Sequence, residues 1–152
     1  MLNFILTIDN LWITSKIKPI LHFAVSYKRI KMIKDKTLVI GASDRNDKYS
    51  NIATRLLLQK GYEVKTIGSK AGFIGQTEIL TEMIPWHDIH TITLYINPEI
   101  QKKYYEYILK LKPIRILFNP GTENDELRKL AESEGIETEY ACTLVLLNLN
   151  QY

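Results

Sequence analysis

The chain has 152 residues, 45% of them hydrophobic and 24% charged, which suffices for one globular domain with a sizeable core. A single cysteine excludes an intrachain disulfide, and no apolar run approaches the roughly 20 residues that span a bilayer, so we expect a cytoplasmic protein without a membrane partner. The formal charge of +3 does not indicate a nucleic-acid partner, because residues 1–31 hold five Lys or Arg against one Asp and leave 15 basic and 16 acidic side chains in residues 32–152.

The first 31 residues do not share the pattern of the rest of the chain. Asp9 and Asn10 interrupt their apolar stretch and no basic segment precedes it, which does not fit a signal peptide. Pro19 breaks the pattern that a membrane-surface helix would need. We interpret residues 1–31 as an N-terminal extension and hypothesise that the native product begins at Met32, with residues 32–152 as the functional domain.

From residue 36 onward, short apolar runs alternate with helical patterns. Residues 37–41 (TLVIG) predict a strand buried on both faces, and residues 50–60 predict a helix with Ser50 as N-cap and Gly61 as its stop. Gly135 is expected to stop a later helix. The other predicted strands cover residues 63–68, 91–96, 114–118 and 136–140, and the other predicted helices cover residues 98 to about 111 and 123–134.

This alternation predicts an α/β fold, doubly wound, with a mainly parallel five-stranded sheet and helices on both faces. The apolar tail after residue 142 is expected to form a short helix or a terminal strand.

The end of the first predicted strand carries small residues. Gly41, Ala42 and Ser43 follow the apolar run, and Ser50 and Asn51 stand at the start of the next helix. Small residues let the backbone approach an anion, and the free N–H groups of a helix start attract phosphate. An ordinary turn with a Ser N-cap explains the same residues.

The second predicted strand ends with Gly68, Ser69 and Lys70 and without an acid. Since NAD-binding domains place Asp or Glu here to bind the ribose diol, the sequence disfavours NAD. A lysine suits a phosphorylated ribose, although Lys70 taken alone reads as a solvated loop residue.

The third and fourth strand ends repeat an Asn-Pro pair. These ends read Ile96-Asn97-Pro98 and Asn119-Pro120-Gly121. Each pair puts a side-chain amide and a rigid turn at the same edge of the sheet, where the pair can line a ligand groove. The alternative is purely structural, because Asn-Pro is a common way to end a strand and begin a helix.

Catalytic and metal-binding patterns are weak. His87 and His90 precede the third strand, away from the expected cleft, and Pro85 argues against a helix that would seat a metal between them. Cys142 follows the last strand and either approaches the cleft or is a buried, inert thiol, which we favour because no His or Lys lies near it in sequence. We therefore predict no catalytic residue and no metal ligand.

From about Lys34 to Tyr152 the chain resembles the stand-alone CoA-binding domain family, which is related to the N-terminal domain of the succinyl-CoA synthetase α subunit. The resemblance lies in VIGAS with the downstream Ser50-Asn51, QKGYEV, GSKAGFIG, LYINPE, FNPGTEN and EYACTL, in this order and spacing. It implies a Rossmann-like fold that binds coenzyme A or an acyl-CoA, with the ADP part across the strand ends.

Carried over by position, the resemblance implies a role for each strand end. Gly41, Ala42, Ser43 and Ser50, with Asn51 beside them, would meet phosphates, and Lys70, following Gly68, would face the phosphorylated ADP portion. Ile96, Asn97 and Pro98 would border the nucleotide, and Asn119, Pro120 and Gly121 would lie near the pantetheine.

The chain also departs from the synthetase. DRNDKY replaces further glycines of the first loop, and the synthetase domain that carries a phosphorylated histidine has no counterpart, so ligase activity is not expected.

The sequence favours a small non-catalytic CoA- or acyl-CoA-binding protein with a regulatory or carrier role, while leaving open whether it is an enzyme. One alternative is an NADP-linked or acyl-CoA-handling enzyme that uses Cys142. Another is an interaction module that has lost its ligand, in which the apolar residues 143–149 would form a homodimer interface.

Overall fold

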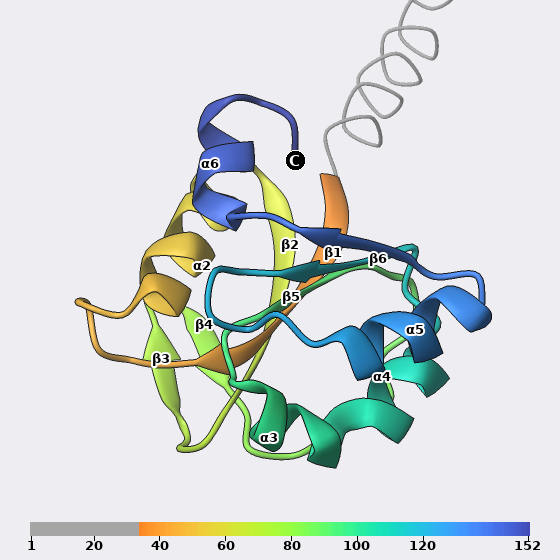
Figure 1. Cartoon of the computed structure of the whole chain (residues 1–152). Helices are drawn as coiled ribbons and strands as arrows, with labels where there is room; N and C mark the ends of the chain where they lie inside the picture. The colour runs from red at the N-terminus through yellow and green to blue at the C-terminus, as the bar shows by residue number, and fades with distance from the viewer. Residues whose placement is uncertain (1–33) are drawn as a thin grey trace, which may run out of the picture. The chain divides into compact units, whose positions relative to one another are not determined.

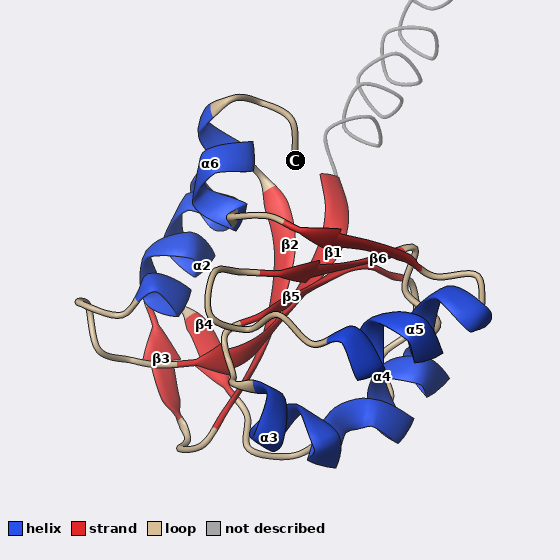
Figure 2. Cartoon of the chain, in the orientation of Figure 1, coloured by secondary structure: helices blue, strands red, loops and turns tan. Residues whose placement is uncertain are grey.

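The computed structural model describes residues 34–152, so the expectations about residues 1–31 lie outside the described residues. Within residues 34–152 one sheet contains β1 (Lys34–Ala42), β2 (Tyr62–Gly68), β5 (Ile89–Leu94), β6 (Arg115–Phe118) and β7 (Glu137–Tyr140). The strands lie in the order β2-β1-β5-β6-β7, and all neighbouring pairs are parallel (Figure 2). The predicted five-stranded parallel sheet is confirmed, and its winding direction reverses between β1 and β5.

Helices cover both faces of the sheet, as predicted (Figure 1). One face carries α2 (Tyr49–Gln59) and α6 (Thr143–Asn148), and the other carries α3 (Pro98–Gln101), α4 (Tyr105–Leu111) and α5 (Asp125–Ser133). In β1, Leu38 and Ile40 belong to the core that includes residues of α4 and α5, and Val39 to the core that includes residues of α2 and α6. Because successive side chains of a strand point to opposite faces, this apolar run is buried on both sides.

The helix boundaries correct two details of the sequence reading. Lys48, not Ser50, is the N-cap of α2, and Ser50 is buried inside the first turn, where its carbonyl accepts a hydrogen bond from Thr54. The helix predicted from residue 98 to about 111 is broken by a 3₁₀ turn, Lys102–Tyr104, between α3 and α4. Gly61 and Gly135 follow the C-cap residues of α2 and α5 with φ of 85° and 76°, so both predicted stops are confirmed.

A short antiparallel hairpin, β3 (Gly72–Ile74) and β4 (Thr77–Ile79), was not predicted. Its strands of three residues are too short for a recognisable alternating pattern. Ile74 and Ile79 are buried in the core that also contains Leu57 of α2, so the hairpin completes this face next to β2. Among residues 34–152, no helix has the length and hydrophobicity needed to cross a bilayer.

Candidate functional site

A groove of about 520 Å³ lies at the carboxyl edge of the sheet, where the winding reverses between β1 and β5. In doubly wound sheets this is where ligands bind. Eight predicted site residues line it, namely Gly41, Ala42, Ser43, Ser50, Ile96, Asn97, Pro120 and Gly121. The lining residues that the sequence reading missed are Lys48, Tyr49, Ser69, Tyr95, Ile100, Tyr104 and Thr122. Most of these directly neighbour a predicted residue, which is the only sequence signal that marks them.

Gly41 and Gly68 are glycines because the strand ends approach each other closely. Gly41 has a φ of 97°, and a Cβ there would lie 2.7 Å from the carbonyl oxygen of Tyr95, which directly follows the neighbouring strand β5. A Cβ on Gly68 would collide with the carbonyl oxygen of Ala42. Gly68 does not line the groove, so the structure accounts for it by the packing of β2 against β1.

The start of α2 opens into the groove without a capping side chain. Lys48 makes no side-chain cap, and the first turn of this helix contains no acid. Such a helix start carries N–H groups without intrahelical acceptors and a partial positive charge. It can therefore hold an anion at the position where Ser43, Lys48 and Ser50 line the groove.

Asn51 fixes the turn that precedes this helix start. Its buried amide donates to the carbonyl of Ser43 (2.9 Å) and accepts from Nε of Arg55 (2.8 Å). The intervening loop is exposed, and within it the Arg45 guanidinium hydrogen-bonds the Asp47 carboxylate and holds the pKa of that group below its usual value. Asn51 thus positions the loop and does not line the groove.

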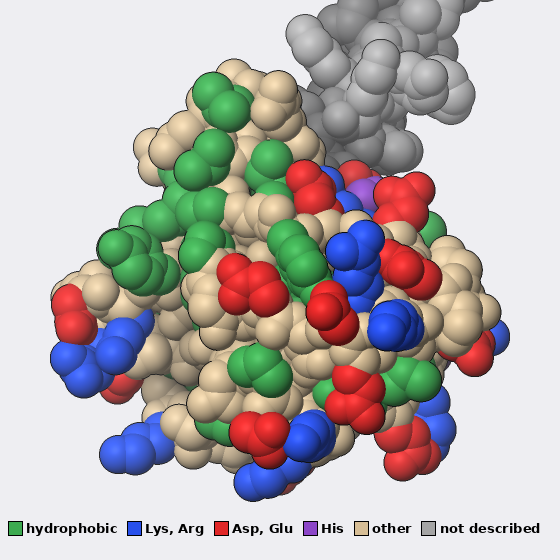
Figure 3. All heavy atoms as spheres, viewed as in Figure 1, with side chains coloured by type: hydrophobic (Ala, Val, Ile, Leu, Met, Phe, Trp, Pro, Cys, Tyr) green, Lys and Arg blue, Asp and Glu red, His purple; other side chains and the backbone are tan. Residues whose placement is uncertain are grey.

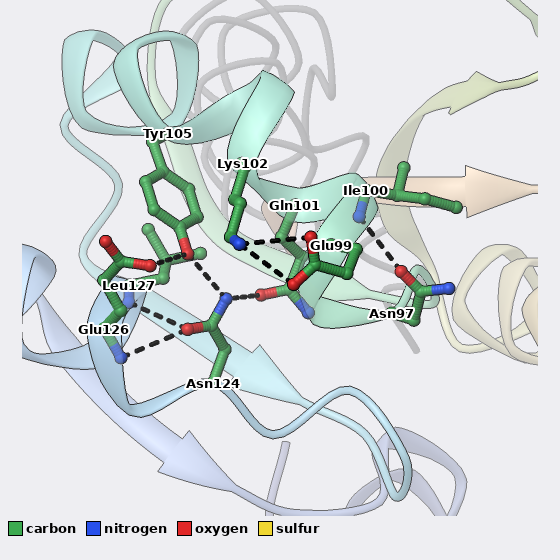
Figure 4. Close-up of polar contacts among 9 residues, drawn as sticks. All are labelled: Asn97, Glu99, Ile100, Gln101, Lys102, Tyr105, Asn124, Glu126 and Leu127. Carbon is green, nitrogen blue, oxygen red and sulfur yellow. Dashed lines mark hydrogen bonds and ion pairs between the residues drawn. The ribbon is translucent and has the colours of Figure 1, made fainter.

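A buried amide network holds the opposite wall (Figure 4). Gln101 is fully buried, and its Nε2 donates to the carbonyls of Ile96 (2.9 Å) and Thr122 (2.7 Å). Asn124 donates to Oε1 of Gln101 and to the hydroxyl of Tyr105, both at 2.8 Å, while its Oδ1 caps the start of α5. The network ties the turn after β5 to the turn after β6, so their separation across the groove is set by the fold.

The two Asn-Pro pairs serve different purposes. Asn97 is exposed on the groove wall and caps α3 by accepting from the N–H of Ile100 (3.0 Å), with Pro98 at the first helical position and outside the groove lining. Asn119 is buried and donates to Oγ1 of Thr93 (2.7 Å) and to the carbonyl of Leu94 (3.0 Å). Its Oδ1 accepts from the N–H of Thr143 (2.9 Å), so this amide joins β5, β6 and the start of α6.

Lys70 is exposed and outside the lining, whereas its neighbour Ser69 lines the groove. A contact between Lys70 and a ligand phosphate stays a prediction. His90 lies in β5 with its Nε2 3.4 Å from a carboxylate oxygen of Asp35, and no group of three or more potential metal ligands gathers among residues 34–152.

A second cavity of about 300 Å³ adjoins the groove. Tyr49, Tyr95 and Pro120 line both, and Asn119, Cys142 and Leu144 complete the cavity lining. Cys142 is a half-buried free thiol that lines this cavity, so it lies beside the groove and not buried in the core, whereas its inertness stays a prediction. Burial raises the pKa of Tyr95 to about 12, so its phenol is neutral at physiological pH.

Hydrophobic side chains gather over α2 and α6 (Figure 3). The exposed members include Tyr49 and Ile52 of α2, Val145 of α6 and Leu149, the residue that caps the end of α6. A homodimer interface formed by residues 143–149 is compatible with this surface and stays a prediction.

Comparisons with known proteins agree on family and fold. A family model described as CoA binding domain matches residues 35–148. A crystal structure of a protein described as uncharacterized is 41% identical with a TM-score of 0.76, covering 78% of this chain and 98% of that one. A conserved hypothetical protein from Pyrococcus furiosus is 25% identical (TM-score 0.66, covering 74% and 98%), and a Thermus thermophilus protein at 16% shares the fold alone (TM-score 0.69, covering 78% and 90%). No curated protein matches the chain significantly. Since the family model spans most of its length, the chain belongs to the CoA-binding domain family.

Proposed function

We propose that this protein binds coenzyme A or an acyl-CoA in the groove at the carboxyl edge of the sheet, without catalysis of its own. The observation that carries the proposal is the uncapped start of α2 beside the Gly41-Ala42-Ser43 turn, at the point where the winding reverses. Membership of the CoA-binding domain family supports the identity of the ligand.

The chemistry of the groove suits the parts of the ligand. The N–H groups of the α2 start, the hydroxyls of Ser43 and Ser50 and the Lys48 ammonium offer hydrogen bonds and positive charge to the pyrophosphate. The apolar surface of Ile96, Ile100 and Tyr104 suits the adenine. The pantetheine then runs past Pro120 and Gly121, and Lys70, next to Ser69, faces the phosphate on the ribose.

The groove favours binding over catalysis. Among the described residues, those that line it include no carboxylic acid and no histidine, the side chains that most often act as general acid or base. A regulatory or carrier role follows, in which the bound and free forms are distinguished by a partner or the ligand is passed on.

Calorimetry with CoA, dephospho-CoA, NADP and NAD tests the proposal. We expect CoA to bind at least tenfold more tightly than dephospho-CoA, a difference of about 1.4 kcal/mol. Lys70→Ala should remove this difference. Lys129→Ala is the matched control, because Lys129 is also exposed but lies on α5. Binding of NADP tenfold more tightly than CoA, or no binding of CoA, would reject the proposal.

One observation favours an acyl-CoA-handling enzyme as a second candidate, namely that the free thiol of Cys142 lines the cavity next to the groove. The Cys142 thiol would lose its proton and its sulfur would attack an acyl-CoA thioester, the acyl–sulfur bond to CoA would break, and CoA would leave as a thiolate that takes up that proton. Intact-mass measurement after incubation with acetyl-CoA decides this: acetylation absent from Cys142→Ser supports the enzyme, and an unchanged mass rejects it.

A further inference from the structure

The 300 Å³ cavity next to the groove differs from the groove in its chemistry. It lies between the ends of β5 and β6 and the start of α6, and is lined by Tyr49, Tyr95, Asn119, Pro120, Cys142 and Leu144. Lys48, Ser43 and Ser50 belong to the groove, whereas the cavity lining among residues 34–152 contains no charged side chain. A ligand that follows the shared residues Tyr49, Tyr95 and Pro120 therefore passes from a polar region into an apolar one.

Of the buried polar groups in the cavity lining, the Asn119 amide is engaged within the protein and the Tyr95 hydroxyl is not. Both sides of the Asn119 amide are hydrogen-bonded within the protein, to Thr93, Leu94 and Thr143. The Tyr95 hydroxyl is buried beside the hydroxyls of Thr143 and Thr93 but makes no hydrogen bond among the described residues, and burial keeps its pKa well above neutrality, so it stays uncharged. The cavity thus offers apolar contact and no cation to neutralise a carboxylate.

The cavity has the volume of a small apolar group. An apolar cavity of about 150 Å³ binds benzene in another protein, so twice that volume accommodates the end of a pantetheine with a short acyl chain. Burying such a chain removes its methylene groups from water, whereas a terminal carboxylate would be desolvated with no cation in the lining to pair with it.

We propose that this cavity is an acyl subsite that selects short, uncharged acyl groups over free CoA and over acyl groups ending in a carboxylate. The inference rests on the proposed function, since it needs the CoA moiety to lie in the groove. It identifies the class of ligand as a short-chain, neutral acyl-CoA thioester.

Butyryl-CoA and succinyl-CoA form a matched pair for the test, because both acyl groups have four carbons and differ in the terminal carboxylate. We expect butyryl-CoA to bind at least tenfold more tightly in calorimetry than either CoA or succinyl-CoA. If CoA binds but butyryl-CoA binds no more tightly, or succinyl-CoA equals it, the acyl subsite is overturned and the proposed function stands. If none of the three binds, both fall.

Filling the cavity gives a second, independent readout. Leu144→Trp adds bulk to the lining, and Val145→Trp places the same indole at the next residue of α6, which is 53% exposed and outside the lining. The ratio of butyryl-CoA to CoA affinity should fall to about one in Leu144→Trp and stay unchanged in Val145→Trp. Tyr49→Ala opens the wall and should also lower the ratio. It covers the case in which Leu144→Trp fails to fold, since Tyr49 is 71% exposed. An undiminished ratio in a folded Leu144→Trp or in Tyr49→Ala would overturn the proposal.

Discussion

Asn97 and Asn119 both end a strand and both precede a proline, yet we expect Asn119→Ala to cost far more stability than Asn97→Ala. In Asn119→Ala, the buried N–H of Thr143 and the carbonyl of Leu94 lose the partner that the amide supplied, as does the hydroxyl of Thr93. The Thr93 hydroxyl keeps its hydrogen bond with Oγ1 of Thr143 (2.7 Å). The groups that lose the Asn119 amide without this compensation are therefore two, the N–H of Thr143 and the carbonyl of Leu94.

Each buried polar group left unpaired costs about 1–3 kcal/mol, so the loss of unfolding free energy in Asn119→Ala is about 4 kcal/mol. Asn97→Ala removes one exposed helix cap, which costs about 1 kcal/mol. A typical domain is stable by about 5–15 kcal/mol, so both variants should fold.

Urea unfolding followed by far-UV circular dichroism measures both losses under the same conditions. Equal slopes of free energy against urea would show that the unfolded states expose similar surface. The reasoning is refuted if the two variants lose the same stability within about 1 kcal/mol, because the internal hydrogen bonds of Asn119 would then contribute no more than a surface cap. The butyryl-CoA preference should also fall in Asn119→Ala, since this residue positions the start of α6.

Three further predictions test the packing of the strand ends, the wall of the groove and the buried phenol. In urea unfolding, Gly41→Ala should lose at least twice as much stability as Gly61→Ala. An alanine at either position would adopt a positive φ at a cost of about 1–2 kcal/mol, but only the Cβ at residue 41 would also meet a backbone carbonyl. Equal losses of stability would contradict this reasoning. Gln101→Glu should lower the free energy of unfolding by roughly 3 kcal/mol or more at pH 7, because a buried carboxylate would face two carbonyls, and by less at pH 5. Gln59→Glu on the exposed face of α2 is the control. Similar losses of stability in the two variants would count against the network. Because the Tyr95 pKa is about 12 in the folded state and about 10 in the unfolded state, its titration contributes at most about 3 kcal/mol of stability. This contribution is complete below pH 10 and is lost as the pH rises toward 12. Tyr95→Phe should therefore lose less stability than the parent protein between pH 9 and pH 11, and parallel pH profiles would disprove the assignment.

Local pattern was enough to predict the five strands of the sheet and the helices that follow β1 and β6, but not the β3–β4 hairpin. The run TLVIG marks β1 because a strand covered on both faces is apolar throughout, and Gly61 and Gly135 mark helix ends because glycine adopts positive φ at no steric cost. The alternation of such strands with helices predicts the parallel sheet, and hence which turns lie together at its carboxyl edge. For this reason eight predicted site residues line the groove.

What each polar residue at that edge does depends on the lateral order of the strands. Asn97 and Asn119 look alike in sequence, but β6 lies between β5 and β7, which places Asn119 where it bonds β5 and the start of α6, while Asn97 stays at the surface. Cys142 likewise lies more than 40 residues after Tyr95 in the sequence, and only the return of the chain after β7 brings both to one cavity. The sequence by itself determined the elements and the edge at which they end, because burial and backbone conformation leave local patterns. Only the tertiary structure decided which side chains face a ligand and which hold the edge together, because that depends on neighbours distant in the chain.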